Sequence, residues 1–367
     1  MKKFVSLLLA VCMLMTIVSF AAAEDWKVAM ITDYGDITDQ SFNQTTYEAA
    51  KAFCEANGVD FNYYKPTGDT TAERVAMVDK AIEDGYNIIV MPGYAFGETI
   101  AEEQDLYSEV KFIALDVGEG DLGGATLSAN TFSAVYQEEL AGYMAGYAAV
   151  KLGYKHLGFL GGMAVPAVIR YGFGFVQGAD AAAVELGIAD QVTVEYVYGN
   201  QFFGDADITA YMDNWYQTLG VEVVFACGGG IFTSASEAAQ KVEGGKVIGV
   251  DVDQAALIDG NYGEGLTVTS AMKGLAATVN TLLTATIIDG TFDTTYGGQL
   301  QNLGLVSGDD PAANYVQLGS TQWSDSFTED DYKALVAAMF DGTVTVSNAT
   351  EAMPETAVTV NDLGTVK

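Results

Sequence analysis

Short apolar runs alternate with longer amphipathic stretches along the first third of the chain. Apolar runs typical of buried strands lie at 27–32, 59–64, 87–91 and 111–115, and apolar positions recur at helical spacing over 45–54 and 72–84. This strand, helix, strand rhythm predicts right-handed parallel crossovers. We therefore expect the first part of the chain to form a doubly wound sheet.

The rhythm starts again after residue 130, beginning with a long helix predicted over 134–151. Strands are predicted at 156–160, 192–198, 221–226 and 246–250, with helical stretches at 205–219 and 233–242. The second half thus repeats the architecture of the first. By analogy of fold, this predicts a two-lobed α/β protein of the type I periplasmic binding class, in which each lobe is a doubly wound parallel sheet flanked by helices and a three-strand hinge joins the lobes.

The chain has 367 residues, which exceeds the usual size of a single hydrophobic core and favours two domains. We assign 24–128 plus about 256–300 to lobe one, and 129–255 plus about 301–325 to lobe two and the hinge. Residues 326–349 are predicted to hold a C-terminal amphipathic helix, and 350–367 to form a loose polar tail.

The first 23 residues have the layout of a secretory signal peptide. A basic start is followed by an apolar run over 4–20 and by three alanines before Glu24, so we expect cleavage after Ala23. The mature protein is then exported, to the periplasm or the extracellular face of the membrane, without inserting into the bilayer. The alternatives are an uncleaved anchor, because the apolar run approaches the length that spans a bilayer, and a lipoprotein, because of Cys12.

The composition excludes several classes of function. The formal net charge is −33, and so acidic a surface repels nucleic acid, whose binding depends on clustered Lys and Arg. Cys54 and Cys227 are the cysteines that follow the leader, so we expect no disulfide framework. With His156 as the single histidine, we expect neither a metal site nor a cofactor.

A polar loop over 33–44 follows the first predicted strand. It holds three aspartates, the amides Asn43 and Gln44, the hydroxyl of Ser41 and the ring of Phe42. Loops at the carboxyl ends of parallel strands form the ligand sites of open α/β sheets. These residue types can hydrogen-bond a polar ligand and stack on a flat one. The alternative is a polar turn in which Asp39 or Ser41 caps a helix and Phe42 is buried.

Several motifs occur in a fixed order along the chain. They are Asp33-x-Gly with Asp39-x-Ser-Phe-Asn-Gln44, Gly161-Gly-x-x-x-Pro166, the glycine-rich runs 172–178 and 226–230, Gly249-x-Asp-x-Asp253 and Ser270-x-x-Lys273. Together they resemble the basic membrane protein family, ABC transporter substrate-binding proteins that include purine nucleoside receptors. The resemblance covers about residues 27–346. One departure is Asp36, which stands where the family usually has a second glycine.

The resemblance implies a set of ligand-binding residues. Asp33, Phe42 and Asn43 would face the cleft from lobe one, with Phe42 stacking on a base. Asp116 and Asp251 would each bind ligand hydroxyls from the end of a strand. The other residues that it implies are Gly229, Gly230, Phe232 and, as a cationic donor, Lys273.

Two further residues are added from their sequence positions. Tyr94 follows the Pro92-Gly93 break at the same predicted sheet edge and would supply a second aromatic face. Arg170 lies near the start of a lobe-two helix, from which it would reach a carboxylate or hydroxyl in the cleft, or pair with a surface acid.

The predicted function is that of an extracytoplasmic substrate-binding protein of an ABC importer. We expect a monomer, not an enzyme, that captures a nucleoside between its lobes by hinge closure and is recognised by a membrane permease. A receptor for a sugar or another polar metabolite is the alternative within the same fold. An exported hydrolase using Asp33, Asp36 and Asp39 is a remote alternative, disfavoured because no nucleophile elbow or histidine-based triad is recognisable.

Overall fold

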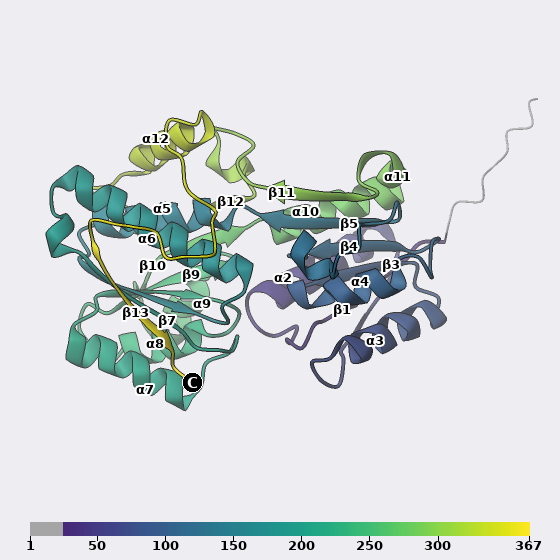
Figure 1. Cartoon of the computed structure of the whole chain (residues 1–367), viewed down its shortest axis with the longest axis horizontal. Helices are drawn as coiled ribbons and strands as arrows, with labels where there is room; N and C mark the ends of the chain where they lie inside the picture. Colours follow the sequence, from purple (N-terminus) through teal and green to yellow (C-terminus); the bar gives the residue numbers. More distant parts are fainter. Residues whose placement is uncertain (1–24) are drawn as a thin grey trace, which may run out of the picture.

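A computed structural model describes residues 25–367 and shows two α/β lobes side by side (Figure 1). The predicted signal peptide, residues 1–23, lies outside the described residues. Within the described part of the chain, no helix combines the length and the apolar character needed to cross a bilayer.

Lobe one is built on a parallel sheet with the strand order β11-β5-β4-β3-β1-β2. Its strands are β1 (Lys27–Ile31), β2 (Asp60–Tyr64), β3 (Ile88–Pro92), β4 (Lys111–Leu115), β5 (Thr131–Tyr136) and β11 (Gln299–Leu303). Its helices are α2 (Phe42–Asn57), α3 (Thr71–Glu83), α4 (Gly97–Glu103), α10 (Leu275–Leu283), its continuation Thr284–Ile288, and α11 (Phe292–Thr295), with short 3-10 turns at Tyr94–Phe96 and Glu119–Leu122.

Lobe two contains a sheet with the order β12-β10-β9-β8-β6-β7-β13, in which β12 runs antiparallel to β10. Its strands are β6 (His156–Gly161), β7 (Thr193–Tyr198), β8 (Val223–Cys227), β9 (Lys246–Asp251), β10 (Thr267–Lys273), β12 (Val316–Leu318) and β13 (Thr359–Thr365). Its helices are α5 (Glu138–Lys151), α6 (Pro166–Leu186), α7 (Ala206–Asn214), its continuation Trp215–Leu219, α8 (Phe232–Ala239), α9 (Ala255–Tyr262) and α12 (Glu329–Phe340), with short turns at Ala189–Gln191 and Pro311–Ala313.

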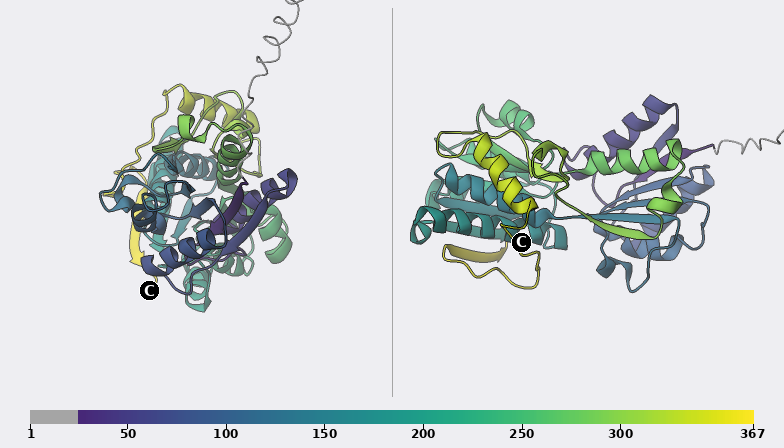
Figure 2. Two further views of the ribbon diagram at one scale, coloured as in Figure 1. Left: turned by 90° about the vertical axis from the view of Figure 1, so that its right-hand side faces the viewer. Right: turned by 90° about the horizontal axis from the view of Figure 1, so that it is seen from above.

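The fold class predicted from the sequence is confirmed, and the two lobes repeat one strand order. Reading β5-β4-β3-β1-β2 in lobe one and β10-β9-β8-β6-β7 in lobe two gives the same pattern of crossovers. The chain passes between the lobes after β5, after β10 and between β11 and β12, and the views of Figures 1 and 2 show these segments running from one lobe to the other. The carboxyl ends of both sheets therefore face a common space.

Three details of the predicted organisation are wrong. Residues 134–136, expected to open a helix, belong to strand β5, whose buried residues pair with β4 in the sheet of lobe one although 129–255 was assigned to lobe two. The helix α9 and the strand β10, assigned to lobe one within 256–300, belong to lobe two, where β10 pairs with β9 and β12. The expected loose tail over 350–367 contains β13, which completes the edge of the second sheet beside β7.

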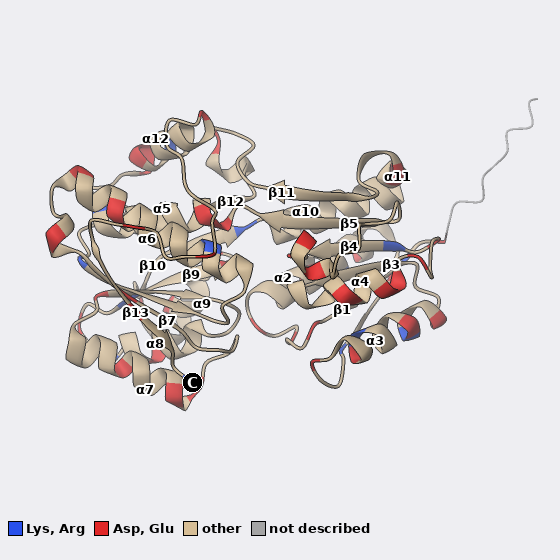
Figure 3. Ribbon diagram, in the orientation of Figure 1, with Lys and Arg blue, Asp and Glu red and all other residues tan. Residues whose placement is uncertain are grey.

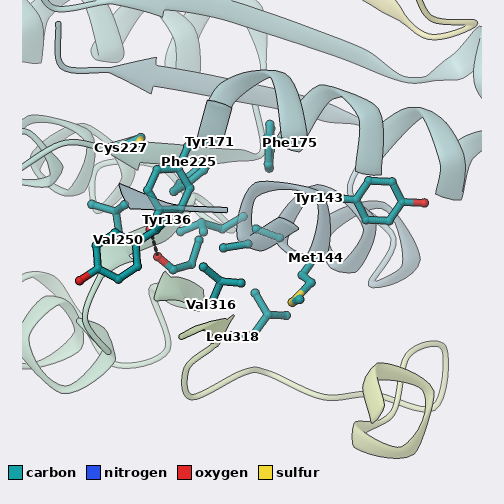
Figure 4. Close-up of a cluster of buried hydrophobic side chains, with 14 of the residues drawn as sticks. Tyr136, Tyr143, Met144, Tyr171, Phe175, Phe225, Cys227, Val250, Val316 and Leu318 are labelled. Carbon is teal, nitrogen blue, oxygen red and sulfur yellow. Dashed lines mark hydrogen bonds between the residues drawn. The ribbon is translucent and has the colours of Figure 1, made fainter. Parts of the chain in front are cut away.

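Helices α5 and α6 pack so closely that glycine is required at their contact. A Cβ atom at Gly142 would lie 2.1 Å from the carbonyl oxygen of Tyr171, and one at Gly178 would lie 2.0 Å from that of Tyr143. Because the two helix backbones touch, positions at their contact must be glycine, which has no Cβ atom. Beneath them, the buried rings of Tyr171 and Phe225 lie in the core of lobe two (Figure 4). This core supports the lobe-two strand ends that carry the candidate site.

Candidate ligand-binding site

A cleft of about 720 Å³ lies between the lobes, at the carboxyl ends of both sheets. All but one of the predicted site residues line it. Those that do are Asp33, Phe42, Asn43, Tyr94, Asp116, Arg170, Gly229, Gly230, Asp251 and Lys273. The exception is Phe232, which starts α8 with its side chain 1% exposed in the core of lobe two, so we withdraw it as a ligand-binding residue.

Helix α2 begins at the cleft, and its first turn is held by Asp39. The Asp39 carboxylate accepts hydrogen bonds from the backbone N–H groups of Ser41, Asn43 and Gln44 at 2.9–3.0 Å. Ser41 occupies the N-cap position but makes no side-chain cap bond. Its hydroxyl instead donates to Asp251 of lobe two at 2.5 Å. Asp39 thus supplies the cap, which leaves the Ser41 hydroxyl to join the two lobes across the cleft.

The amide of Asn43 has a fixed orientation. Its Nδ2 donates to the Asp39 carboxylate at 3.2 Å, which identifies Oδ1 as the other amide atom. Asn43 is 6% exposed, and its Oδ1 has no hydrogen-bond partner among the described residues. A buried acceptor without a donor is costly, so an N–H or O–H group placed at this atom would be favourable.

Asp116 and Asp251 occupy equivalent positions in the two lobes. Asp116 follows β4 and Asp251 ends β9, and their φ angles of 63° and 64° are in the left-handed region, which is uncommon for residues other than glycine. Such strained backbone occurs preferentially at functional sites. Burial raises the pKa of Asp251, and it raises that of Asp116 to about 6 against the opposing effect of Lys273.

Lys273 is the centre of a buried charge network. Its Nζ lies 2.6 Å from Oδ2 of Asp116 in lobe one and 3.0 Å from Oε1 of Glu138 at the start of α5. Burial alone would lower the pKa of Lys273, but the neighbouring carboxylates of Asp116 and Glu138 outweigh burial and raise it. The ammonium also lies 5.2 Å from the ring centroid of Phe42. Oδ1 of Asp116 has no hydrogen-bond partner within residues 25–367.

Arg170 lines the cleft from helix α6, as expected, but its partner is buried. Its Nε donates to Oε2 of Glu138 at 2.6 Å, and the Glu138 side chain is fully buried. Oε2 of Glu138 therefore accepts a hydrogen bond from Arg170, whereas Oε1 forms an ion pair with Lys273 without hydrogen-bond geometry. Glu138 is neither a surface acid nor a residue of the cleft lining, the two kinds of partner expected for Arg170. It lies at the crossing from β5 to α5, a position that no sequence motif distinguished.

Asp33 and Tyr94 both line the cleft at the end of the lobe-one sheet. Oδ1 of Asp33 accepts the backbone N–H of Gly35 at 2.6 Å, and a Cβ atom at Gly93 would lie 2.8 Å from its Oδ2. Gly93, with φ at 125°, therefore lets the carboxyl group sit against the backbone. Burial raises the pKa of Asp33 to about 6 and also raises that of Tyr94.

Four aromatic residues that line the cleft were not predicted: Tyr34, Phe202, Phe203 and the buried Tyr171 of α6. Tyr34 lies within the 33–44 loop, its hydroxyl donates to Sδ of Met163 in lobe two at 3.3 Å, and its ring stacks on Phe202 with centroids 6.4 Å apart. Phe202 and Phe203 belong to the loop 199–205 after β7, and Phe203 is 61% exposed. A Phe pair four and five residues after the end of a predicted strand is the signal that could have identified this loop.

The glycine turn after β8 lines the cleft, and one of its backbone N–H groups is used within the protein. Gly228 and Gly229 have φ angles of 139° and 53°, so other residues would be strained there. The N–H of Gly230 donates to the carbonyl oxygen of Phe202 at 2.8 Å. This donor is therefore used to hold the 199–205 loop.

Acidic residues are spread over both lobes (Figure 3). Among residues 25–367, no group of three or more His, Cys, Asp and Glu side chains is placed to hold a metal ion. His156 lies at the start of β6 and contacts Glu195 at 3.0 Å.

The family that matches this chain, and several proteins with similar sequences or folds, are named for solute binding. A family model described as Bmp, ABC transporter substrate-binding protein PnrA-like, matches residues 26–309. The ABC transporter nucleoside-binding protein BmpA of Lactococcus lactis subsp. cremoris is 25% identical over 245 residues, 64% of this chain and 66% of that protein. Basic membrane protein A of Borreliella afzelii is 25% identical over 284 residues, 77% of this chain and 81% of that protein. A solved structure of an ABC transporter solute-binding protein from Aeropyrum pernix K1 matches with a TM-score of 0.66 and 20% identity, covering 87% of each chain.

Proposed function

This chain belongs to the PnrA-like family of ABC transporter substrate-binding proteins, and we propose that it binds a nucleoside in its cleft for uptake by an ABC importer. The family implies a small-molecule ligand, a transporter permease as partner and a location outside the cytoplasm. The choice of a nucleoside, the direction of transport and a monomeric state are our proposals. The name of the Lactococcus relative, a nucleoside-binding protein, agrees with that choice of ligand.

One observation carries the proposal: buried acceptor atoms line the cleft without donors. Oδ1 of Asn43 and Oδ1 of Asp116 have no hydrogen-bond partner in the described part of the chain. A ligand that presents several N–H and O–H groups would satisfy both atoms. A nucleoside has such groups at both ends, since its base offers N–H donors and its ribose offers a hydroxyl pair.

The positions of these atoms support a specific arrangement. Asn43 and Phe42 are neighbours at the start of α2, so a base that stacks on the Phe42 ring would present its edge to Asn43. The face of Phe42 turned away from Lys273 would receive the base, because the ammonium occupies the other face. The ribose hydroxyls would then lie between Asp116 and Asp251, which come from opposite lobes.

The electrostatics of the cleft favour a neutral ligand over a phosphorylated one. Asp33, Asp39, Asp116 and Asp251 all line the cleft, and Lys273 is already held by two carboxylates. A phosphate group in this space would be repelled at close range in a partly desolvated site. We therefore propose that nucleotides are rejected.

The lobes touch across the cleft through polar contacts that support closure. Ser41 donates to Asp251, and Nε2 of Gln254 in lobe two donates to the carbonyl oxygen of Gln40 in lobe one at 3.0 Å. A ligand that binds both lobes would favour the closed form over the open one. The proposal includes no chemical conversion of the ligand.

Thermal unfolding against a panel of ligands tests this proposal. Inosine, guanosine and adenosine should raise the midpoint by several degrees at saturating concentration, since a ligand of the folded state stabilises it by mass action, whereas inosine monophosphate should give a much smaller shift. Phe42→Ala and Asp116→Ala should abolish the nucleoside shift. Their matched controls Phe340→Ala and Asp330→Ala, on the distant helix α12, should preserve it. A shift with sugars alone would replace the nucleoside by a sugar in the same fold.

A further inference from the structure

The last residues of the sequence run along the edge of lobe two and end near the cleft. The family match ends at residue 309, whereas β13 covers Thr359–Thr365 and pairs in parallel with β7. Figures 1 and 2 show this segment as a yellow strand beside β7 that ends close to α7. The strand therefore lies outside the family match and inside the architecture of lobe two.

The segment is attached at both ends of β13. Before the strand, the backbone N–H groups of Ala357 and Val358 donate to Oδ1 of Asp180 on α6 at 2.6 and 3.0 Å. Within it, Nδ2 of Asn361 donates to Glu195 of β7 at 3.0 Å. The backbone N–H of Val366 then donates to the carbonyl oxygen of Tyr198, the last residue of β7, at 2.8 Å.

A local irregularity directs the end of the segment towards the cleft loop. The register with β7 shifts between Asp362 and Thr365, and Gly364 in this stretch has a φ of 70°. A bulge of this kind bends a strand and re-aims the residues that follow. Beyond it, Nζ of Lys367 forms an ion pair with Asp205 and lies 3.6 Å from Asp207.

Asp205 ends the loop 199–205, whose residues Phe202, Phe203 and Gly204 form part of the lobe-two wall of the cleft. Its carboxylate caps α7 by accepting the N–H groups of Asp207 and Ile208, and it also accepts Nε2 of Gln201 at 2.8 Å. The same Nε2 donates to the carbonyl oxygen of Phe203. Lys367, Asp205 and Gln201 thus form one cluster directly behind the aromatic residues that line the cleft.

We infer that β13 and Lys367 hold the 199–205 loop in place, so that residues 359–367 are positioning residues for ligand binding. The strand fixes Tyr198 at the base of the loop, and Lys367 fixes Asp205 at its other end. A loop whose two ends are anchored loses less conformational freedom when a ligand binds. The consequence for affinity rests on the proposed function, whereas the consequence for loop order does not.

The experiment compares Lys367→Met with Lys333→Met in the full chain. Lys333 pairs with Glu329 on α12 at 2.7 Å, so the control removes an equivalent surface ion pair far from the loop. Amide hydrogen exchange of residues 199–205, without ligand, should be two- to fivefold faster in Lys367→Met and unchanged in the control. The Kd for inosine, measured by calorimetry, should rise two- to fivefold. Gly364→Val, which strains the bulge, should give larger changes in both quantities.

Unchanged exchange in the loop of both Lys367→Met and Gly364→Val would overturn the inference. Faster exchange with an unchanged Kd for inosine would overturn the role in binding. If the wild-type protein binds none of the nucleosides, the proposed function fails, and loop exchange alone then decides whether residues 359–367 hold the loop.

Discussion

Ionisation of the buried Asp33 carboxyl group in the cleft lowers the stability of the folded protein. Asp33 is 7% exposed, and burial raises its pKa from 3.8 to about 6 although the Gly35 amide donates to it. A difference of about two pKa units corresponds to roughly 3 kcal/mol at a pH where the group is ionised in both states. Asp33→Asn removes the charge and keeps an acceptor oxygen for Gly35. We expect it to stabilise the fold by about 1 to 3 kcal/mol at pH 8.

The dependence on pH has a definite sign. Because the pKa of Asp33 is higher in the folded state than in the unfolded state, the folded protein binds this proton more tightly. The destabilisation by the charge is therefore absent below about pH 4, grows between pH 4 and 6, and is constant above about pH 7. The increase in stability caused by Asp33→Asn should therefore depend on pH in the same way. Affinity for the ligand should fall, since the carboxylate that faces the cleft is lost.

Urea unfolding of wild type and variant at pH 4.5 and pH 8 measures the effect. The matched control is Asp36→Asn, three residues away, whose carboxylate is half-exposed and accepts a hydrogen bond from Lys65 at 2.7 Å. That contact lowers the pKa of Asp36, so the same substitution there should destabilise the fold slightly at pH 8, by less than about 1 kcal/mol. A loss of stability in Asp33→Asn at pH 8, or a gain of equal size at both pH values, would refute the reasoning.

Three further substitutions test the packing, the charge network and the cleft wall. Gly178→Ala forces a Cβ atom against the Tyr143 carbonyl oxygen and should lower the free energy of unfolding in urea by about 1 to 3 kcal/mol. The control Gly260→Ala in α9, with open space around it, should raise that free energy by up to about 1 kcal/mol. Equal effects at the two sites would contradict the close packing of α5 and α6. Lys273→Met leaves Asp116 without its cation and should lower the free energy of unfolding by about 3 to 5 kcal/mol at pH 8. The loss of stability should be smaller at pH 5, where the carboxyl group of Asp116 can be protonated. A loss of stability that is independent of pH would show that the unpaired charge of Asp116 is not its cause. Phe203→Ala removes an exposed ring from the cleft wall and should weaken inosine binding in calorimetry without changing the melting temperature; an unchanged Kd would remove Phe203 from the site.

The sequence predicted the elements that repeat and missed those that depend on distant partners. The alternation of apolar runs and helical stretches was enough to identify the fold, because parallel crossovers follow from that rhythm. Strand β10 was placed in the wrong lobe, since its neighbours β9 and β12 are a property of the folded sheet. Strand β13 was read as a tail because most of its residues are exposed and polar, a pattern that carries little apolar signal. Glu138 was missed for a related reason: its importance comes from two cations that are distant in sequence.

The repeated strand order explains why the carboxylates of the two lobes meet in one cleft. Strands β4 and β9 occupy equivalent positions in their sheets, so Asp116 and Asp251 are delivered to facing edges by the same topology. Their shared left-handed backbone conformation could not be predicted, because an aspartate in the sequence does not indicate a positive φ. Asparagine or glycine would adopt that conformation with less strain. A strained backbone that holds a buried carboxylate costs stability twice, through conformation and through desolvation. Under the proposed function, hydroxyl donors of the ligand would offset this cost by meeting both carboxylates in the closed form, which would couple binding to the approach of the lobes.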